Sequence, residues 1–214
     1  MYDGRTNIPA NVSETTDVPP GGPVRFFAVV EKDPPPLFEE DFEANDGGFT
    51  LKAADGGFTP SGSPWAWGDP DSTGPGGSVT EGNGSSTNCW GTDIGNPGYF
   101  IDPTETCLQS AIIDLTGVTA AELTFAEALD LEAGDTAVVN LIDDTTNTVI
   151  AAAIYTAADS SPTDANWSDV AAIDLSAGAG QLVRIEWCLS GFGGTSDDYM
   201  GWYIDDVVVT DTSP

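Results

Sequence analysis

Short segments in which apolar and polar residues alternate recur along the chain, and this period of two is the pattern of half-buried β-strands. Turn signals separate the segments, among them the pair Asp143 and Asp144 and the glycine-rich run 178–180. No convincing amphipathic helix is present, and residues 119–122 would make a turn at most. The pattern predicts strands or extended segments at 37–43, 49–52, 65–67, 88–93, 106–115, 122–131, 136–143, 148–155, 167–175, 181–190 and 201–210.

Many short strands with short connections favour an all-β fold, in which two antiparallel sheets pack as a β-sandwich of the jelly-roll type. At 214 residues the chain is long enough for one large domain of this kind with an appendage. We assign the jelly-roll domain to residues 37–214 and an extended N-terminal arm to residues 1–36. No run of about 20 apolar residues exists, so we expect no segment to span a bilayer.

The arm contains one strand-like segment, VRFFAVVE at residues 24–31, which is followed by the stiff proline run 34–36. Its apolar side chains point to both faces and it has no local hairpin partner, so alone in water it would expose them together with an unpaired backbone ladder. We expect it to add as a strand to the sheet of a neighbouring subunit, through Val24, Phe26, Phe27, Val29 and Val30. The alternatives are that the arm folds back on its own sandwich or is the remnant of a preceding domain.

Acidic residues dominate the composition, with five Lys and Arg against 35 Asp and Glu and a formal net charge of −30. Nucleic acids and anionic membranes are bound mainly through Lys and Arg, so this balance argues against both as partners. The excess of acids suits a medium that is salty or rich in divalent cations, because such ions screen the self-repulsion of the chain.

The strand predicted at residues 201–210 carries two adjacent acids, Asp205 and Asp206, in an otherwise apolar run. A buried carboxylate is costly unless a cation or a set of N–H donors compensates it. Because the chain has too few Lys and Arg to neutralise its own acids, oxygen-rich calcium coordination is the first hypothesis. The alternative is that one acid faces inward and hydrogen-bonds a loop, while the other faces water.

Three cysteines are present, Cys89, Cys107 and Cys188. Cys89 and Cys107 bracket a segment rich in Gly, Asn and Asp, and we predict a disulfide between them that staples this loop and indicates an oxidising compartment. One of the three thiols is then left over. The alternative is that all three are reduced and act as small core residues.

Seven segments resemble the jelly-roll modules of the MAM-like and immune-inhibitor-A-like type, which occur in large extracellular proteins of bacteria and archaea. They are DFEANDGGFT, WAWGDP, CWGTDIGNPGYF, CLQSAIIDLTG, LTFAEALDLEAGDTAVV, IDLSAGAGQLVRIEWCLS and GWYIDDVVV, within residues 37–210. The resemblance implies an accessory module. It also implies a structural Ca²⁺ between the acidic first strand and the last, with Asp41, Glu43, Asp205 and Asp206 as ligands. For a second calcium site the candidates are Asp93, Asp197 and Asp198.

Catalysis is hard to build from this composition. The chain has no histidine, which excludes or strains the Ser-His-Asp and Cys-His arrangements and the usual zinc sites. Paired carboxylates would formally allow a glycosidase, but nothing marks which two. A solvated acidic face explains these residues more simply, so we expect no enzymatic activity.

Aromatic residues in loop-rich sequence are the case for carbohydrate binding, because sugars stack on rings while Asp and Asn bind their hydroxyls. The candidates are Trp65, Trp67, Trp90, Tyr99 and Phe100. The alternative is that these rings pack inside the sandwich or cover its ends.

These observations favour a non-catalytic structural or adhesive module that lies outside the cell or on its surface. We expect it to form a homo-oligomer, filament or surface polymer by donating segment 24–31, and to be stabilised by calcium. The alternative is a carbohydrate-binding accessory module of a larger secreted protein, with an extracellular polysaccharide as its partner.

Overall fold

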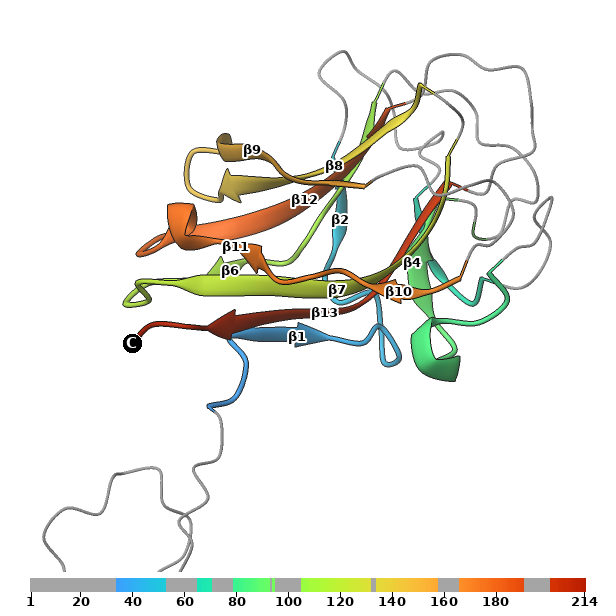
Figure 1. Cartoon of the computed structure of the whole chain (residues 1–214), viewed down its shortest axis with the longest axis horizontal. Helices are drawn as coiled ribbons and strands as arrows, with labels where there is room; N and C mark the ends of the chain where they lie inside the picture. Colours follow the sequence, from blue (N-terminus) through green and yellow to red (C-terminus); the bar gives the residue numbers. More distant parts are fainter. Residues whose placement is uncertain are drawn as a thin grey trace, which may run out of the picture. The chain divides into compact units, whose positions relative to one another are not determined.

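β-Strands form nearly all of the regular structure in a computed structural model of the protein (Figure 1). The structure describes residues 34–52, 65–70, 79–92, 94, 105–131, 134–157, 166–190 and 201–214. Within these ranges the strands form two antiparallel sheets that pack as a sandwich, together with two short 3-10 turns, η2 (Asn83–Ser85) and η3 (Ser176–Gly178). One compact unit spans Pro36–Pro214. The described residues contain no helix long and apolar enough to cross a membrane.

The seven-stranded sheet is centred on β7 (Ala121–Asp130) and β13 (Gly201–Asp211), which pair over most of their length. Beside β13 lie β1 (Phe38–Glu40) and β4 (Cys89–Gly91), and β3 (Ala66–Gly68) pairs with β4. Beside β7 lie β10 (Ser168–Asp169) and β11 (Ile173–Asp174). The last strand of the chain is therefore near the middle of this sheet.

The six-stranded sheet has the order β2 (Thr50–Lys52), β5 (Thr106–Gln109), β12 (Leu182–Ser190), β8 (Thr136–Asp143) and β9 (Thr148–Ala157), with β6 (Ile113–Asp114) beside β12. In the part of the chain that the structure describes, β9 pairs with β8 alone and forms one edge of the sheet. The connection between β8 and β9 is the turn predicted at Asp143 and Asp144. The chain passes repeatedly from one sheet to the other, for example from β7 to β8.

The core lies between the sheets and is built from alternate strand positions, whose side chains share one face. Leu108, Trp187 and Val139 are register partners on β5, β12 and β8, and all three are fully buried. From the other sheet, Phe125 meets Trp187 edge to face with ring centroids 5.7 Å apart. Each alternating segment thus removes one apolar face from water, which is why the pattern of the sequence folds as strands.

The predicted all-β sandwich is confirmed, and two of the predicted strands are divided. Residues 106–115 form β5 and β6, and between them the Ser110 hydroxyl accepts the backbone N–H of Ile185 in place of a ladder bond. Residues 167–175 form β10 and β11, both beside β7. The predicted strand at 24–31, with all of its expected contact residues, lies outside the described residues.

Candidate functional site

Asp205 lies in the middle of β13, and its side chain is fully buried. Its Oδ2 atom accepts hydrogen bonds from the backbone N–H of Asn83 at 2.8 Å and from the Ser86 hydroxyl at 2.9 Å. Its Oδ1 atom accepts the backbone N–H of Asp206 at 2.8 Å. We call residues 82–88, which precede β4, the anchored loop, because Asp205 fixes them to the last strand.

Two further acids bind the same loop. Asp206 is exposed, and its Oδ2 atom accepts a hydrogen bond from Asn83 Nδ2 at 2.8 Å. Glu43, just after β1, accepts through Oε1 the backbone N–H groups of Thr87 at 2.8 Å and of Asn88 at 2.7 Å. Carboxylates from both ends of the domain therefore supply the acceptors for the donors of the anchored loop.

Gly82 shows how closely the anchored loop approaches the buried acid. A Cβ atom at this position would lie 2.8 Å from Asp205 Oδ2 and 2.0 Å from Ser86 Oγ. A side chain at this position would force the Ser86 hydroxyl and the Asp205 carboxylate, or the loop itself, to shift. Burial raises the pKa of Asp205 to about 6, although the N–H and hydroxyl donors oppose this shift.

The residues predicted to bind calcium do not converge as a set of metal ligands. Among the described residues, no three of Asp41, Glu43, Asp205 and Asp206 offer carboxylate oxygens that all lie within 4.8 Å of one another. N–H and O–H donors of the anchored loop face Asp205 and Glu43, and Asp41 Oδ1 accepts the N–H of Glu43 at 3.1 Å. The last strand thus has one buried acid that hydrogen-bonds a loop and one exposed acid, as in the alternative given above. Asp93, Asp197 and Asp198 lie outside the described residues, and calcium binding stays a prediction.

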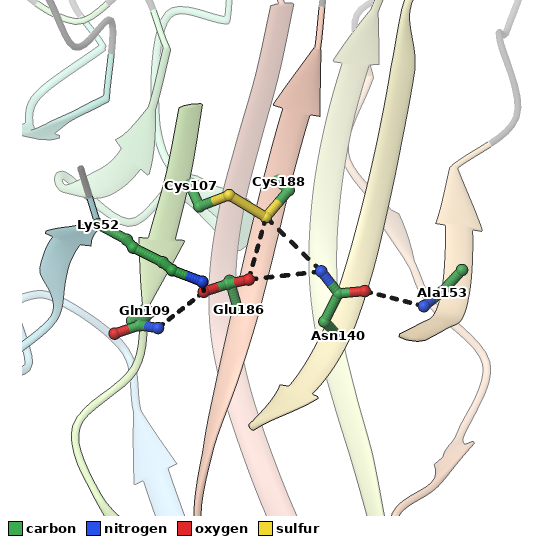
Figure 2. The surroundings of a disulfide bond; sticks show 7 residues. All are labelled: Lys52, Cys107, Gln109, Asn140, Ala153, Glu186 and Cys188. Carbon is green, nitrogen blue, oxygen red and sulfur yellow. Dashed lines mark hydrogen bonds and ion pairs between the residues drawn. A yellow bond between two sulfur atoms is a disulfide. The ribbon is translucent and has the colours of Figure 1, made fainter. Parts of the chain in front are cut away.

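The predicted disulfide between Cys89 and Cys107 is wrong, because Cys107 is joined to Cys188 (Figure 2). These two residues are register partners on β5 and β12, with Cα atoms 4.1 Å apart. Cys89 lies in β4 of the other sheet, where its thiol is free and buried. Desolvation raises the pKa of that thiol far above its usual range, so it is protonated and unreactive at neutral pH. Strand register, and not closeness in sequence, decides the pairing.

Glu186 is buried beside the disulfide and is surrounded by compensating groups (Figure 2). Its Oε2 atom lies 2.8 Å from Lys52 Nζ and accepts a hydrogen bond from Gln109 Nε2 at 2.7 Å. Its Oε1 atom accepts a longer bond from Asn140 Nδ2 at 3.4 Å. Asn140 Oδ1 in turn accepts the backbone N–H of Ala153 in β9 at 2.9 Å. One buried carboxylate thus organises side chains from β2, β5, β8 and β12.

Both cations of the jelly-roll domain lie on this side of the six-stranded sheet. Residues 37–214 contain only Lys52 and Arg184 as cationic side chains. Along β12, Arg184, Glu186 and Cys188 alternate with core residues and so share the face that points away from the core. Arg184 donates through Nε to Asp144 Oδ1 at 2.6 Å and through Nη1 to the Ser110 carbonyl at 2.8 Å. We call this the outer face of the six-stranded sheet.

A third buried acid, Glu127, links the two sheets through the core. Its Oε1 atom accepts a hydrogen bond from the Tyr155 hydroxyl of β9, and its Oε2 atom accepts one from Trp202 Nε1 of β13 at 2.9 Å. Burial raises the pKa of Glu127 and, together with the nearby carboxylate, that of Tyr155. The sequence carried a signal for this residue, since Glu127 continues the inward series Leu123, Phe125 in an apolar run, but we did not predict it.

Two of the rings proposed for carbohydrate stacking are core residues. Trp65 is 3% exposed and packs against Trp202, and Trp90 is 6% exposed and stacks near Phe49. Neither can present a ring face to a sugar in this structure, so their assignment to a glycan site is corrected. Trp67 is 38% exposed, and Tyr99 and Phe100 lie outside the described residues. The alternation of Trp65 with Trp67 indicated a strand, but it did not indicate that Trp65, which immediately precedes β3, is buried in the core.

One cluster of metal-ligating residue types lies near the disulfide. Glu105, Cys107 and Cys188 offer ligand atoms within 4.8 Å of one another. The two sulfur atoms are bonded to each other, so they are not available as thiolate ligands. The buried acids Glu127, Glu186 and Asp205 are likewise engaged by protein donors, which suits structural roles more than general acid–base catalysis.

Comparisons with known proteins show a shared fold. No protein-family model matches the chain, and no curated protein matches it. The K1 cleaved adhesin domain of Lys-gingipain from Porphyromonas gingivalis W83 is similar in structure, with 18% identity and a TM-score of 0.51 over 82% of this chain and 98% of that domain. The CBM22-1 xylan-binding domain from Paenibacillus barcinonensis Xyn10C matches with 9% identity and a TM-score of 0.47, over 86% of this chain and 99% of that domain. The adhesin domain shows that the chain has a known β-sandwich fold, and the resemblance to MAM-like modules gains no family match.

Proposed function

We propose that the chain is a non-catalytic structural or adhesive module of an extracellular protein, and that it assembles with other copies of itself by donating segment 24–31. The observation that carries this proposal is the long edge strand β9, which pairs with β8 alone among the described residues. An open edge of this length gains backbone hydrogen bonds when another strand is added.

Two features support the proposed extracellular location and the proposed lack of catalytic activity. The disulfide Cys107–Cys188 is a bond that persists in oxidising compartments, such as the cell exterior. The chain lacks histidine, and three of its buried acids are held by protein donors. A head-to-tail contact that does not close into a ring would extend into a filament.

Light scattering on full-length and shortened chains tests this function. We expect the full-length chain to form oligomers, and deletion of residues 1–36 to leave a soluble monomer. Deletion of residues 1–22 is the matched control, because it removes most of the arm but keeps segment 24–31, and it should preserve the oligomers. A full-length chain that stays monomeric at high concentration, with and without calcium, would contradict the proposal.

A carbohydrate-binding accessory module is the second candidate, and the exposed ring of Trp67 favours it. Trp67 lies on the edge strand β3, with its Nε1 atom donating to the Phe42 carbonyl at 3.0 Å. This bond holds the indole in one orientation at the sheet edge, where a sugar ring could stack on it. Binding on a glycan array that is lost in a Trp67→Ala variant would support this function. The buried control is Trp90→Phe, which should keep its binding. Binding that both variants retain, or that both variants lose, would count against a site at Trp67.

A further inference from the structure

We propose that β9 is the acceptor for segment 24–31 of a second copy of this chain. The inference rests on the self-assembly proposed above and names the surface that receives the donated strand. β9 spans Thr148–Ala157, and its only strand partner in the described part of the chain is β8. Its outer edge therefore presents backbone N–H and C=O groups that a further strand can pair.

The hydrophobic core reaches the surface of the sandwich along β9. Ile150, Ile154 and Tyr155 pack against the core but are only partly buried. Their neighbours on β8, Val139 and Leu141, are fully buried. A strand added beside β9 would cover the three partly buried side chains with its own inward residues and remove apolar surface from water.

The outer face of the six-stranded sheet carries three exposed apolar side chains, Ile112, Val149 and Leu182. These side chains are 48%, 50% and 37% exposed, respectively. Val149 pairs with Ile142 of β8, which pairs with Arg184 of β12, two positions from Leu182. Ile112 immediately precedes β6, which pairs with the same end of β12. Of these three residues, Val149 lies on β9 itself, so the open edge has an exposed apolar side chain on its outer face and partly buried core residues on its inner face.

Segment 24–31 has the side chains that such a site needs. In an extended strand Phe26 and Phe27 point to opposite faces. One ring would then cover the partly buried core residues of β9, and the other would pack beside Val149. A strand with a single apolar face would leave polar groups against one of these surfaces. The eight residues of the segment also fit within the ten of β9.

Charge favours the same pairing. Within the segment Arg25 is balanced by Glu31, and just after it Lys32 is balanced by Asp33, so the segment has no net charge. The two cations of the jelly-roll domain are already paired with acids. In a chain with a net charge of −30, a segment with no net charge is repelled less than the rest of a second copy.

A bulge interrupts the pairing of β9 with β8. Ala153 has a φ of 49°, and its N–H is bound by Asn140. Bulges bend an edge strand and hinder indiscriminate edge-to-edge pairing. Pairing with segment 24–31 would therefore have to draw on apolar side-chain contacts as well as on backbone hydrogen bonds.

Crosslinking between two populations of full-length chain tests the acceptor. One population carries Phe26→Cys or Phe27→Cys, and the other carries Val149→Cys. The two are mixed and oxidised, and dimers are measured on a non-reducing gel. The matched control replaces the Val149→Cys partner with Trp67→Cys, an exposed position on the edge of the other sheet. Unsubstituted chains give the background, because Cys89 is buried and the other two cysteines are bonded.

We expect at least one of the two phenylalanine positions to crosslink with Val149→Cys several-fold more than with Trp67→Cys. Light scattering on each variant confirms that assembly is retained. Oligomers that form normally but crosslink equally with both partners, or with neither, would overturn β9 as the acceptor and leave the proposed self-assembly standing. Full-length chains that do not assemble at all would instead contradict the proposed function.

Discussion

The carboxylate of Asp205 accepts the backbone N–H of Asn83 at 2.8 Å, although the two residues are 122 positions apart in the sequence. This bond and its companion from Ser86 join the last strand of the chain to the anchored loop before β4. We predict that Asp205→Ala lowers the free energy of unfolding by about 2 to 3 kcal/mol, because it leaves buried donors without an acceptor. Urea unfolding of the two proteins measures this difference. The control is Asp206→Ala, which removes an exposed acid and should cost much less.

The raised pKa of Asp205 predicts a specific pH dependence. Its folded value of about 6 lies above the ordinary value of 3.8, so between these two pH values the folded chain binds more protons than the unfolded chain. This group therefore makes the protein less stable as pH rises from about 4 to about 6, and constant above. Replacement by asparagine removes this contribution. Melting temperatures recorded against pH should diverge between the two proteins over that interval, and parallel curves would show that Asp205 does not titrate there.

The disulfide between Cys107 and Cys188 closes a separation of 81 residues. The chain-entropy account gives about 4 to 5 kcal/mol for a loop of this size. We predict that the double variant Cys107→Ser, Cys188→Ser melts well below the unsubstituted protein, whereas Cys89→Ser changes the melting temperature much less. Peptide mapping without reductant should find Cys107 joined to Cys188. Recovery of Cys89 in any disulfide-linked peptide would contradict the observed pairing.

Glu186 depends on Lys52 for compensation of its buried charge. We predict that Lys52→Met lowers the free energy of unfolding by about 2 kcal/mol, a value reduced because the Lys52 side chain is partly exposed to solvent. Adding Glu186→Leu should recover most of this loss, since the buried charge is then gone. In the control, Arg184→Met leaves Asp144 without its cation, and this variant should cost less because the Asp144 side chain is 20% exposed whereas that of Glu186 is 3% exposed. A double variant no more stable than Lys52→Met alone would show that the ion pair is not the cause.

Chelation tests the calcium prediction against the hydrogen-bonded loop. If donors of the anchored loop satisfy Asp205 and Glu43 as observed, excess EGTA should leave the melting temperature unchanged. A marked fall on chelation, reversed by added calcium, would show that an ion binds. Repeating the measurement with Asp93→Asn and Asp197→Asn would then separate the second predicted site from the first.

The strands were predictable because apolar alternation is local, and β8 begins and ends where the pattern indicated. The disulfide was not predictable in this way, because Cys107 and Cys188 meet only through the register of β5 with β12. That register depends on contacts between residues far apart in sequence. For the acid pair in β13 the first hypothesis was calcium, which stays a prediction, and the structure shows the hydrogen bonds of the alternative. Which donors compensate the acid pair depends on the course of the anchored loop, and no local pattern reports that course.

The aromatic residues show the same limit. Trp65, Trp67 and Trp90 all stand in sequence rich in glycine and proline, yet only Trp67 of these three is substantially exposed. Trp67 and Trp90 are register partners, so their side chains lie on the same face of the sheet. Their different burial therefore depends on how far each residue lies from the sheet edge. Loop-like sequence around a ring is therefore weak evidence that the ring is available to a ligand.

Self-assembly through segment 24–31 is the central claim, and competition by the segment itself tests it most directly. Sedimentation velocity of the full-length chain is measured with an excess of a synthetic peptide that spans residues 22–33, and with a scrambled peptide of the same composition. The account predicts oligomers that the native peptide converts to monomers and the scrambled peptide does not. Oligomers that sediment unchanged with the native peptide, or a full-length chain that sediments as a monomer without any peptide, would contradict it.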